Sequence, residues 1–297
     1  MKAKRNIAAL FFVYGLLTLR PTCAEIHPAS PARRADAQTL RSIPVRIFRD
    51  YLVVAEGQFG DGLQHQNFVV DTGTAPSIIN TKSIRQLGLA ATASTMIAMG
   101  KTVATQTAVL PEVELGPIRV ANLRVQVQDL SRLERDLGVP VAGILGLDVL
   151  SKSSFRLDYQ NKELEFGEIS DEGIAVSFDE RTEIAVAVVK LAGIPARLLI
   201  DTGSDRVAIL GGNFGETRRL ALWATAQRGS SIADQNMEVQ VFVAPDLIFG
   251  GKHFSVEKAY FIPGGMYPAF DGILGVRALG FRAIAYDQAR AAIYLQK

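Results

Sequence analysis

The sequence is poor in cysteine and histidine, and each shortage excludes a class of chemistry. Cys23 is the only cysteine among 297 residues, so the chain can form no internal disulfide, and the part after the N-terminal segment offers no thiol nucleophile. The three histidines, His27, His65 and His253, are scattered and show neither a His-Glu-x-x-His motif nor a paired spacing. These shortages argue against zinc catalysis. A Gly-x-Ser-x-Gly element is also absent, so the serine hydrolases that carry it are not indicated.

The sequence also lacks a basic stripe. It holds 32 Lys and Arg against 30 Asp and Glu, a formal charge of +2. The first 24 residues hold four of the basic residues and no acid, so the remainder has 28 against 30, a charge of −2. Neither nucleic acid nor an anionic membrane surface is therefore an expected partner. With 48% hydrophobic residues the chain is globular and has room for two domains.

Residues 1–24 are typical of an export signal. Lys2, Lys4 and Arg5 precede an apolar run over 7–19, which is short for a membrane span, and small residues at 22–24 offer a cleavage site. We therefore expect an exported protein, periplasmic or secreted. An uncleaved membrane anchor and a lipoprotein attached at Cys23 are alternatives. Residues 25–41 have no apolar period and predict a flexible lead-in.

One short stretch occurs twice. Residues 68–79 read FVVDTGTAPSII, and residues 198–209 read LLIDTGSDRVAI. Each copy predicts a buried strand that runs into an acid followed by Thr and Gly. An acid at the end of an apolar strand is costly to bury without a partner, so Asp71 and Asp201 are expected to be each other's partners.

The elements around these stretches follow a similar order in both halves. In the first half we predict a hairpin from 43 into Asp71, a helix over 81–87 ended by Gly88, strands over 95–98, 103–109, 113–115 and 123–127, and a hairpin over 155–166. Residues 167–173 predict a linker. In the second half we predict a hairpin over 184–200, a helix over 216–224, strands over 239–243 and 259–262, and a closing hairpin over 284–295. Trp223 in the second helix is read either as core or as a ligand platform.

A glycine-rich apolar run also repeats, at 141–150 and 272–279. The two acids are 130 residues apart (201 − 71), and the leucines before the glycines are 129 apart (274 − 145). Two features at nearly one offset predict a duplicated domain.

This combination resembles the aspartic proteases. Their pattern is an apolar strand, Asp-Thr-Gly-Ser/Thr and, about 70 residues later, two apolar residues and Gly; here the intervals are 75 (146 − 71) and 74 (275 − 201). Each half is similar to a retropepsin-like subunit and the whole plan to pepsin. The resemblance covers roughly 42–297 and implies an all-β fold of two β-barrel lobes, 42–168 and 174–297, with the active site between them.

The resemblance implies an endopeptidase in which Asp71 and Asp201 share a proton and activate a water. Two carboxylates about 3 Å apart repel by roughly 5 kcal/mol at an effective dielectric near 20, so they titrate as a pair. It further implies that the loops are supported by Thr72, Gly73, Thr74, Thr202, Gly203 and Ser204. The two threonines would bond across the lobe interface, and Thr74 and Ser204 would bond the carboxylates. The implied enzyme acts on polypeptides, uses no metal or cofactor and works as a monomer.

The chain departs from the family at the flap, the hairpin that closes over the substrate. The matching stretches, 94–105 and about 226–238, lack the tyrosine of pepsin-like enzymes. Between the halves, Asp148 and Arg277 occupy counterpart positions. We expect Arg277 to pair with Asp205, a solvated surface charge being the alternative. Two other functions stay open: an inactive peptide-binding protein of the same fold, and a glycosidase with two carboxylates, for which no aromatic sugar platform is evident.

Overall fold

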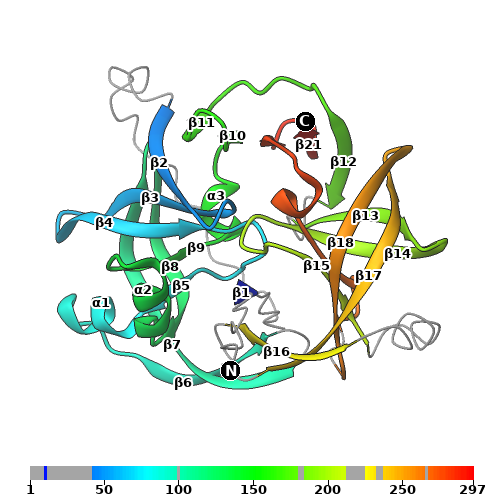
Figure 1. Cartoon of the computed structure of the whole chain (residues 1–297). Coiled ribbons are helices and arrows are strands. Elements are labelled where there is room, and N and C mark those ends of the chain that lie inside the picture. The colour runs from blue at the N-terminus through cyan, green and yellow to red at the C-terminus, as the bar shows by residue number, and fades with distance from the viewer. Residues whose placement is uncertain are drawn as a thin grey trace.

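The computed structural model describes residues 10–11, 42–98, 101–179, 184–211, 225–231, 237–264 and 267–297. Over these ranges the chain is mostly β with few helices, as predicted (Figure 1). The predicted signal over 1–24 and the lead-in over 25–41 lie outside the description, apart from the strand β1 (Leu10–Phe11), which pairs in parallel with a strand of the second half. No helix in the described ranges is long and apolar enough to cross a membrane.

The first half, residues 42–168, contains ten strands and three short helices in its described part. They are β2 (Ser42–Phe48), β3 (Leu52–Phe59), β4 (Leu63–Val70), β5 (Ile78–Asn80), α1 (Thr81–Gln86), β6 (Thr92–Ala98), β7 (Lys101–Leu115), β8 (Ile118–Gln128), α2 (Ser131–Leu137), β9 (Gly143–Leu145), α3 (Leu147–Leu150), β10 (Phe155–Asp158) and β11 (Glu163–Phe166).

The second half, residues 174–297, contains ten strands and one 3₁₀ helix where it is described. They are β12 (Ile174–Asp179), β13 (Ile184–Leu191), β14 (Ile194–Asp201), β15 (Val207–Leu210), β16 (Thr225–Ser231), β17 (Met237–Phe249), β18 (Lys252–Ile262), β19 (Gly272–Gly275), η1 (Val276–Leu279), β20 (Ala283–Asp287) and β21 (Ala292–Gln296).

Most predicted elements of the first half are present. The hairpins into Asp71 and over 155–166 form, and α1 ends before Gly88, whose φ of +65° fits the left-handed turn after a helix. The predicted break between 109 and 113 is wrong, because β7 continues through Pro111. Pro111 is exposed and the β7–β8 register skips it, so its missing N–H costs no ladder bond.

In the second half the hairpin over 184–200, the strands of β17 and β18 and the closing hairpin are present. The helix predicted over 216–224, with Trp223, lies outside the described residues. The linker over 167–173 contains no strand or helix, and β12, which follows it, was not predicted.

The strands that carry the two acids have the same neighbours in each half. β4 runs parallel to β9, and β5 is antiparallel to β9 and parallel to β8. In the second half β14 runs parallel to β19, and β15 is antiparallel to β19 and parallel to β18. In each half a glycine-rich strand is thus enclosed between the strand before the acid and the strand after it.

A six-stranded antiparallel sheet joins the halves. Its order is β2-β11-β10-β20-β21-β12, and its central pair, β10 and β20, brings together strands of different halves. On that pair the rings of Phe155 and Tyr286 stack, with centroids 5.3 Å apart and planes 4° apart. Both side chains are fully buried, so burial of apolar surface holds the halves together at this sheet. In Figure 1 the sheet lies above the centre of the molecule, where the strands that carry the acids converge.

Candidate active site

The structure brings the two predicted acids together. Asp71 follows β4, and its amide donates to the Leu145 carbonyl of β9 at 3.0 Å. Asp201 ends β14 opposite Gly275 of β19. Both carboxyls are fully buried and lie within hydrogen-bonding reach of each other. Two acids that are distant in the chain therefore form one buried pair.

Thr72 and Thr202 join the two acid loops symmetrically. The Thr72 amide donates to Oγ1 of Thr202 at 3.0 Å, and the Thr202 amide donates to Oγ1 of Thr72 at 3.2 Å. Each hydroxyl in turn donates to a carbonyl of the opposite half: Thr72 donates to Ile200, and Thr202 donates to Val70. The predicted bonds across the interface are present. Because all four are buried, they fix the separation of the loops.

The Asp71 carboxyl is well supplied with donors. Oδ1 accepts the Gly73 amide at 2.8 Å, and Oδ2 accepts the hydroxyl of Thr74 at 2.6 Å. Burial raises the pKa of Asp71 above its ordinary value, and the Thr74 and Gly73 bonds oppose that rise by favouring the ionised form.

The Asp201 carboxyl has fewer donors. Oδ1 accepts the Gly203 amide at 2.6 Å, whereas Oδ2 is buried and accepts no hydrogen bond from the residues that the structure describes. Burial and the charge of Asp71 raise the pKa of Asp201 well above its ordinary value. The pKa of Asp201 is therefore raised further than that of Asp71, and the two carboxyls titrate as a pair.

The expectation for Ser204 is wrong. Thr74 bonds its carboxylate, but the hydroxyl of Ser204 donates to the Arg206 carbonyl at 3.1 Å. That carbonyl also accepts the Gly275 amide, so Ser204 closes the turn after the acid instead of supporting the acid. This difference accounts for part of the unequal environments of the two carboxyls.

Two glycines are required by the close packing of the loops. A Cβ on Gly73 would lie 2.4 Å from Cγ of Asp201, and a Cβ on Gly146 would lie 1.9 Å from the Thr74 carbonyl oxygen. Gly73 thus lets one loop approach the acid of the other half. Gly146 lets the chain after β9 approach the Thr74 carbonyl, which accepts a hydrogen bond from the Leu147 amide at 2.9 Å.

Asp148 has a partner that the sequence did not reveal. Its carboxyl accepts the Ser77 amide at 2.8 Å and the Ser77 hydroxyl at 2.6 Å. Ser77 Oγ in turn accepts the Gly146 amide at 2.9 Å. Asp148 therefore ties the chain after Asp71 to the glycine-rich run.

The predicted pair of Arg277 with Asp205 is wrong. Arg277 donates to the carbonyls of Asp50 at 2.9 Å and Phe281 at 2.6 Å, and its guanidinium lies 5.2 Å from the centroid of the Tyr159 ring. Asp205 pairs with its neighbour Arg206 at 3.3 Å. Since Arg206 is adjacent in the chain, it reaches Asp205 without the ordering that a distant partner would need.

Tyr159 was also missed by sequence reasoning. Its hydroxyl is buried and has no hydrogen-bond partner among the described residues. Burial raises its pKa. The charge of Arg277 opposes that rise, and the charges of Asp201 and Asp71 add to it. The tyrosine is therefore a neutral group near the acids, and its position directly after β10 gave no signal of that.

The predicted flap of the first half is the hairpin of β6 and β7. Residues 99 and 100 lie outside the description, so the tip is not characterised. Met96 and Ala98 are buried in one apolar cluster with residues of the second half, among them Leu199 and Tyr260. The hairpin thus reaches the other half with methionine and alanine side chains.

No cluster of three or more potential metal ligands occurs within the described ranges. The chemistry that the paired acids offer is proton transfer through a water. A pair of carboxyls that shares one proton can accept a proton at one member and donate one from the other.

The aspartyl protease family model matches residues 55–149. The match runs from β3 through α3 and so includes Asp71 and the glycine-rich run of the first half. No curated protein matches the chain significantly. The match supports an aspartyl protease family and, in general terms, a hydrolase that acts on polypeptides.

Proposed function

We propose that this chain is an aspartic endopeptidase whose catalytic residues are Asp71 and Asp201. The observation that carries the proposal is the buried pair of carboxyls, held by symmetric threonine bonds from the two halves. Burying two acids together is costly, and Asp201 Oδ2 is left without a described donor. Such a cost is expected where a perturbed pKa serves catalysis.

In the proposed mechanism Asp71 acts as the base and Asp201 as the acid. A water held between the carboxyls attacks the peptide carbonyl carbon while Asp71 takes its proton and Asp201 donates to the carbonyl oxygen. The tetrahedral intermediate then collapses, the nitrogen leaves with the proton from Asp71, and the carboxyl product returns a proton to Asp201. The bonds from Thr74 and Gly73 keep Asp71 ionised for the first step.

We propose that residues 42–168 and 174–297 are two lobes that arose by duplication and that a monomer is the active unit. The repeated neighbours of β4 and β14 support this, as does the identical burial order at 71–80 and 201–210. A chain that supplies both acids needs no second copy. The basic and apolar character of 1–24 supports export, with action in the periplasm or outside the cell.

Cleavage of a mixed peptide library by the full chain between about pH 3 and 7 tests the proposal. Asp71→Asn and Asp201→Asn should each lower the rate by roughly 10³-fold or more while circular dichroism stays unchanged. Asp61→Asn, an exposed carboxyl in the turn after β3, is the matched control and should cleave like wild type. A folded wild type that cuts no peptide at any pH would favour the inactive peptide-binding protein instead.

A further inference from the structure

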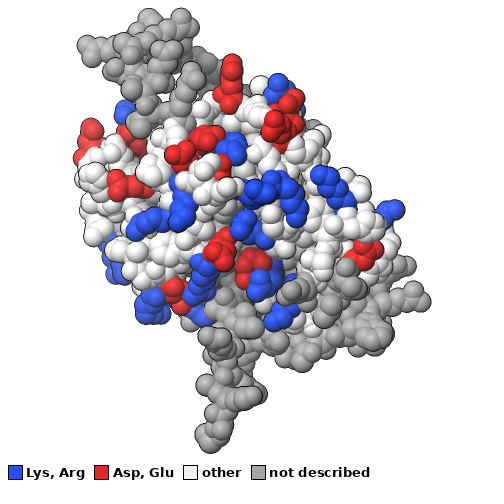
Figure 2. Space-filling view, turned by 45° about the horizontal axis from the view of Figure 1, so that its top comes forward, with Lys and Arg blue, Asp and Glu red and all other residues white. Residues whose placement is uncertain are grey.

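A pocket of about 570 Å³ lies where residues of both halves meet. One wall comes from the turn between β2 and β3, at 49–51. The other comes from the chain after the second acid, at 205–206, from β18 and from η1. We call it the basic pocket, because four of its lining side chains are basic and two are acidic: Arg49, Arg206, Lys258 and Arg277, and Asp50 and Asp205. Figure 2 shows basic side chains gathered at the centre of one face, with a few acidic groups among them.

Two of the cations are not neutralised by a carboxylate. Arg277 is held by two main-chain carbonyls, and no carboxylate in the described part of the chain lies within 4.0 Å of it. Lys258 is exposed and forms no ion pair with any residue that the structure describes. The other two cations have acidic neighbours, since Arg206 pairs with Asp205 and Arg49 lies 4.0 Å from Asp136. The lining side chains alone, four basic and two acidic, have a formal excess of two positive charges, and Asp136 beside Arg49 lowers the excess to one.

The donors of the pocket are pre-positioned for an anion. Arg277 is fixed by its bonds to residues 50 and 281 and by the ring of Tyr159, so little of its side-chain freedom remains to be lost on binding. Arg206 is held by its neighbour Asp205, whose carbonyl accepts a hydrogen bond from Nη1 of Arg206 at 3.0 Å. Charge-assisted bonds from such donors to a carboxylate are roughly twice as strong as neutral ones.

The basic pocket is close to the acids. Asp205 is four residues after Asp201, and consecutive Cα atoms are 3.8 Å apart, so their Cα atoms lie within about 15 Å of each other. An extended peptide covers that distance in about four residues. A substrate whose scissile bond lies over Asp71 and Asp201 is therefore long enough to reach the wall of the pocket that Asp205 lines.

We propose that the basic pocket binds a carboxylate of the peptide substrate within about four residues of the scissile bond. This rests on the proposed peptidase function, and it makes acidic peptides the preferred substrate class. The carboxylate is either a Glu or Asp side chain or the C-terminus of the substrate.

The test compares peptides that carry Glu or Gln at each of four positions on either side of a cleaved bond, all with amidated C-termini. For the full wild-type chain at low salt we expect the Glu peptide to be cut about 5–10-fold faster (kcat/KM) than the Gln peptide for at least one position. That preference should fall sharply at about 0.5 M salt. A parallel set with free C-termini separates the two sources, because a preference confined to that set assigns the pocket to the chain end.

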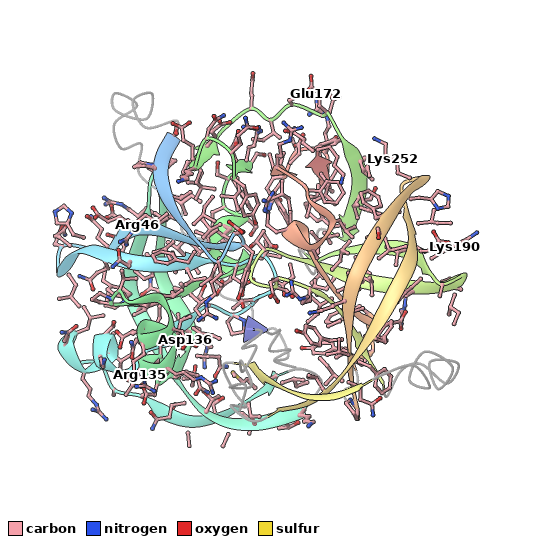
Figure 3. All side chains as sticks on the ribbon, viewed as in Figure 1. Arg46, Arg135, Asp136, Glu172, Lys190 and Lys252 are labelled. Carbon is pink, nitrogen blue, oxygen red and sulfur yellow. The ribbon has the colours of Figure 1, made fainter. Side chains whose placement is uncertain are left out.

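The variant Lys258→Glu should abolish or reverse the Glu preference. The matched control is Lys190→Glu, which makes the same charge change on β13 at the outer edge of the second half, where Figure 3 labels the side chain. The control should keep the wild-type preference and rate. Equal Glu-to-Gln ratios in wild type and Lys258→Glu overturn the proposal, and so does a wild type with no carboxylate preference in either peptide set.

If the wild type cuts nothing, the peptidase function fails but the pocket is still tested by fluorescence anisotropy of the same labelled peptides. Tighter binding of a carboxylate peptide to wild type than to Lys258→Glu supports the pocket in a peptide-binding protein. Equal binding to both overturns it.

Discussion

The unequal bonding of the two acids predicts an unequal response to the loss of their neighbouring hydroxyls. Thr74 donates to Oδ2 of Asp71 at 2.6 Å in a fully buried site. A hydrogen bond to a charged group contributes about 1.5–3 kcal/mol, and 1.36 kcal/mol corresponds to one pKa unit. Thr74→Val keeps the shape of the side chain and removes this bond. The pKa of Asp71 should therefore rise.

The sign of the effect on activity follows from the proposed role of Asp71. The active form needs Asp71 ionised, so activity is lost as the pH falls through its pKa. A raised pKa moves this acid limb upward, by about 1–2 pH units if the whole bond energy is lost. The assay is kcat/KM for one peptide measured across the pH range at constant ionic strength.

Ser204→Ala is the matched comparison, because the Ser204 hydroxyl donates to the Arg206 carbonyl and not to Asp201. Its acid limb should stay at the wild-type position, whatever happens to the maximal rate. Equal shifts in both variants, or an unmoved limb in Thr74→Val, would refute the assignment of the charge to Asp71. Circular dichroism and thermal melts on each variant separate a pKa effect from a loss of structure.

Three further changes test other parts of the structure. Asp201→Asn should raise the thermal midpoint at pH 7 by about 2–4 °C for each kcal/mol of stability gained. The reason is that a folded-state pKa above the unfolded value makes the stability of wild type fall as the pH rises, so the gain should vanish below about pH 3.8. A midpoint that is unchanged at pH 7 would count against a cost of burying this acid. Gly146→Ala should lower the free energy of unfolding in urea by about 2–4 kcal/mol, because the new Cβ meets the Thr74 carbonyl. The control Gly62→Ala, whose Cβ would have its nearest contact at 3.4 Å, should lower it by under about 1 kcal/mol. Similar losses of stability in the two variants would contradict the clash. Phe155→Ala should cost about 3–5 kcal/mol, as expected for a buried ring stacked across the joining sheet, and a loss under about 1 kcal/mol would show that the sheet does not hold the halves together.

Features of short range in the sequence were predictable. Alternating apolar residues predicted the hairpins, because one face of each strand is buried. The helix α2 was missed although its signal was present: Leu130, Leu133 and Leu137 are buried at helical spacing, and Gly138 follows with a φ of +70°. The charged residues among them obscured that period.

The partners of the polar side chains could not be predicted in the same way. Arg277 bonds the carbonyl of residue 50, which is 227 positions earlier in the chain, and carbonyls are present at every residue. Which of them a guanidinium reaches depends on the assembled fold. Similarly, two acceptors were available to the Ser204 hydroxyl, the Asp201 carboxylate and the Arg206 carbonyl. It donates to the Arg206 carbonyl because of the turn there, which is fixed by the bond from the Gly275 amide.

A single chain allows the two halves of the site to differ, which identical subunits cannot do. Asp148 and Arg277 stand at counterpart positions. The Asp148 carboxyl accepts two hydrogen bonds from Ser77, whereas Arg277 donates to two carbonyls and has no carboxylate partner among the described residues. On our proposals, the Ser77–Asp148 bonds leave no free charge at this position of the first half, and the Arg277 charge leaves the second half with a cationic pocket. A peptide with one acidic residue would then lie across Asp71 and Asp201 in a single direction, because only one end of the site attracts the carboxylate. Cleavage of paired peptides with the same residues in reversed order should therefore differ, and equal rates for the two orders would contradict a directional site.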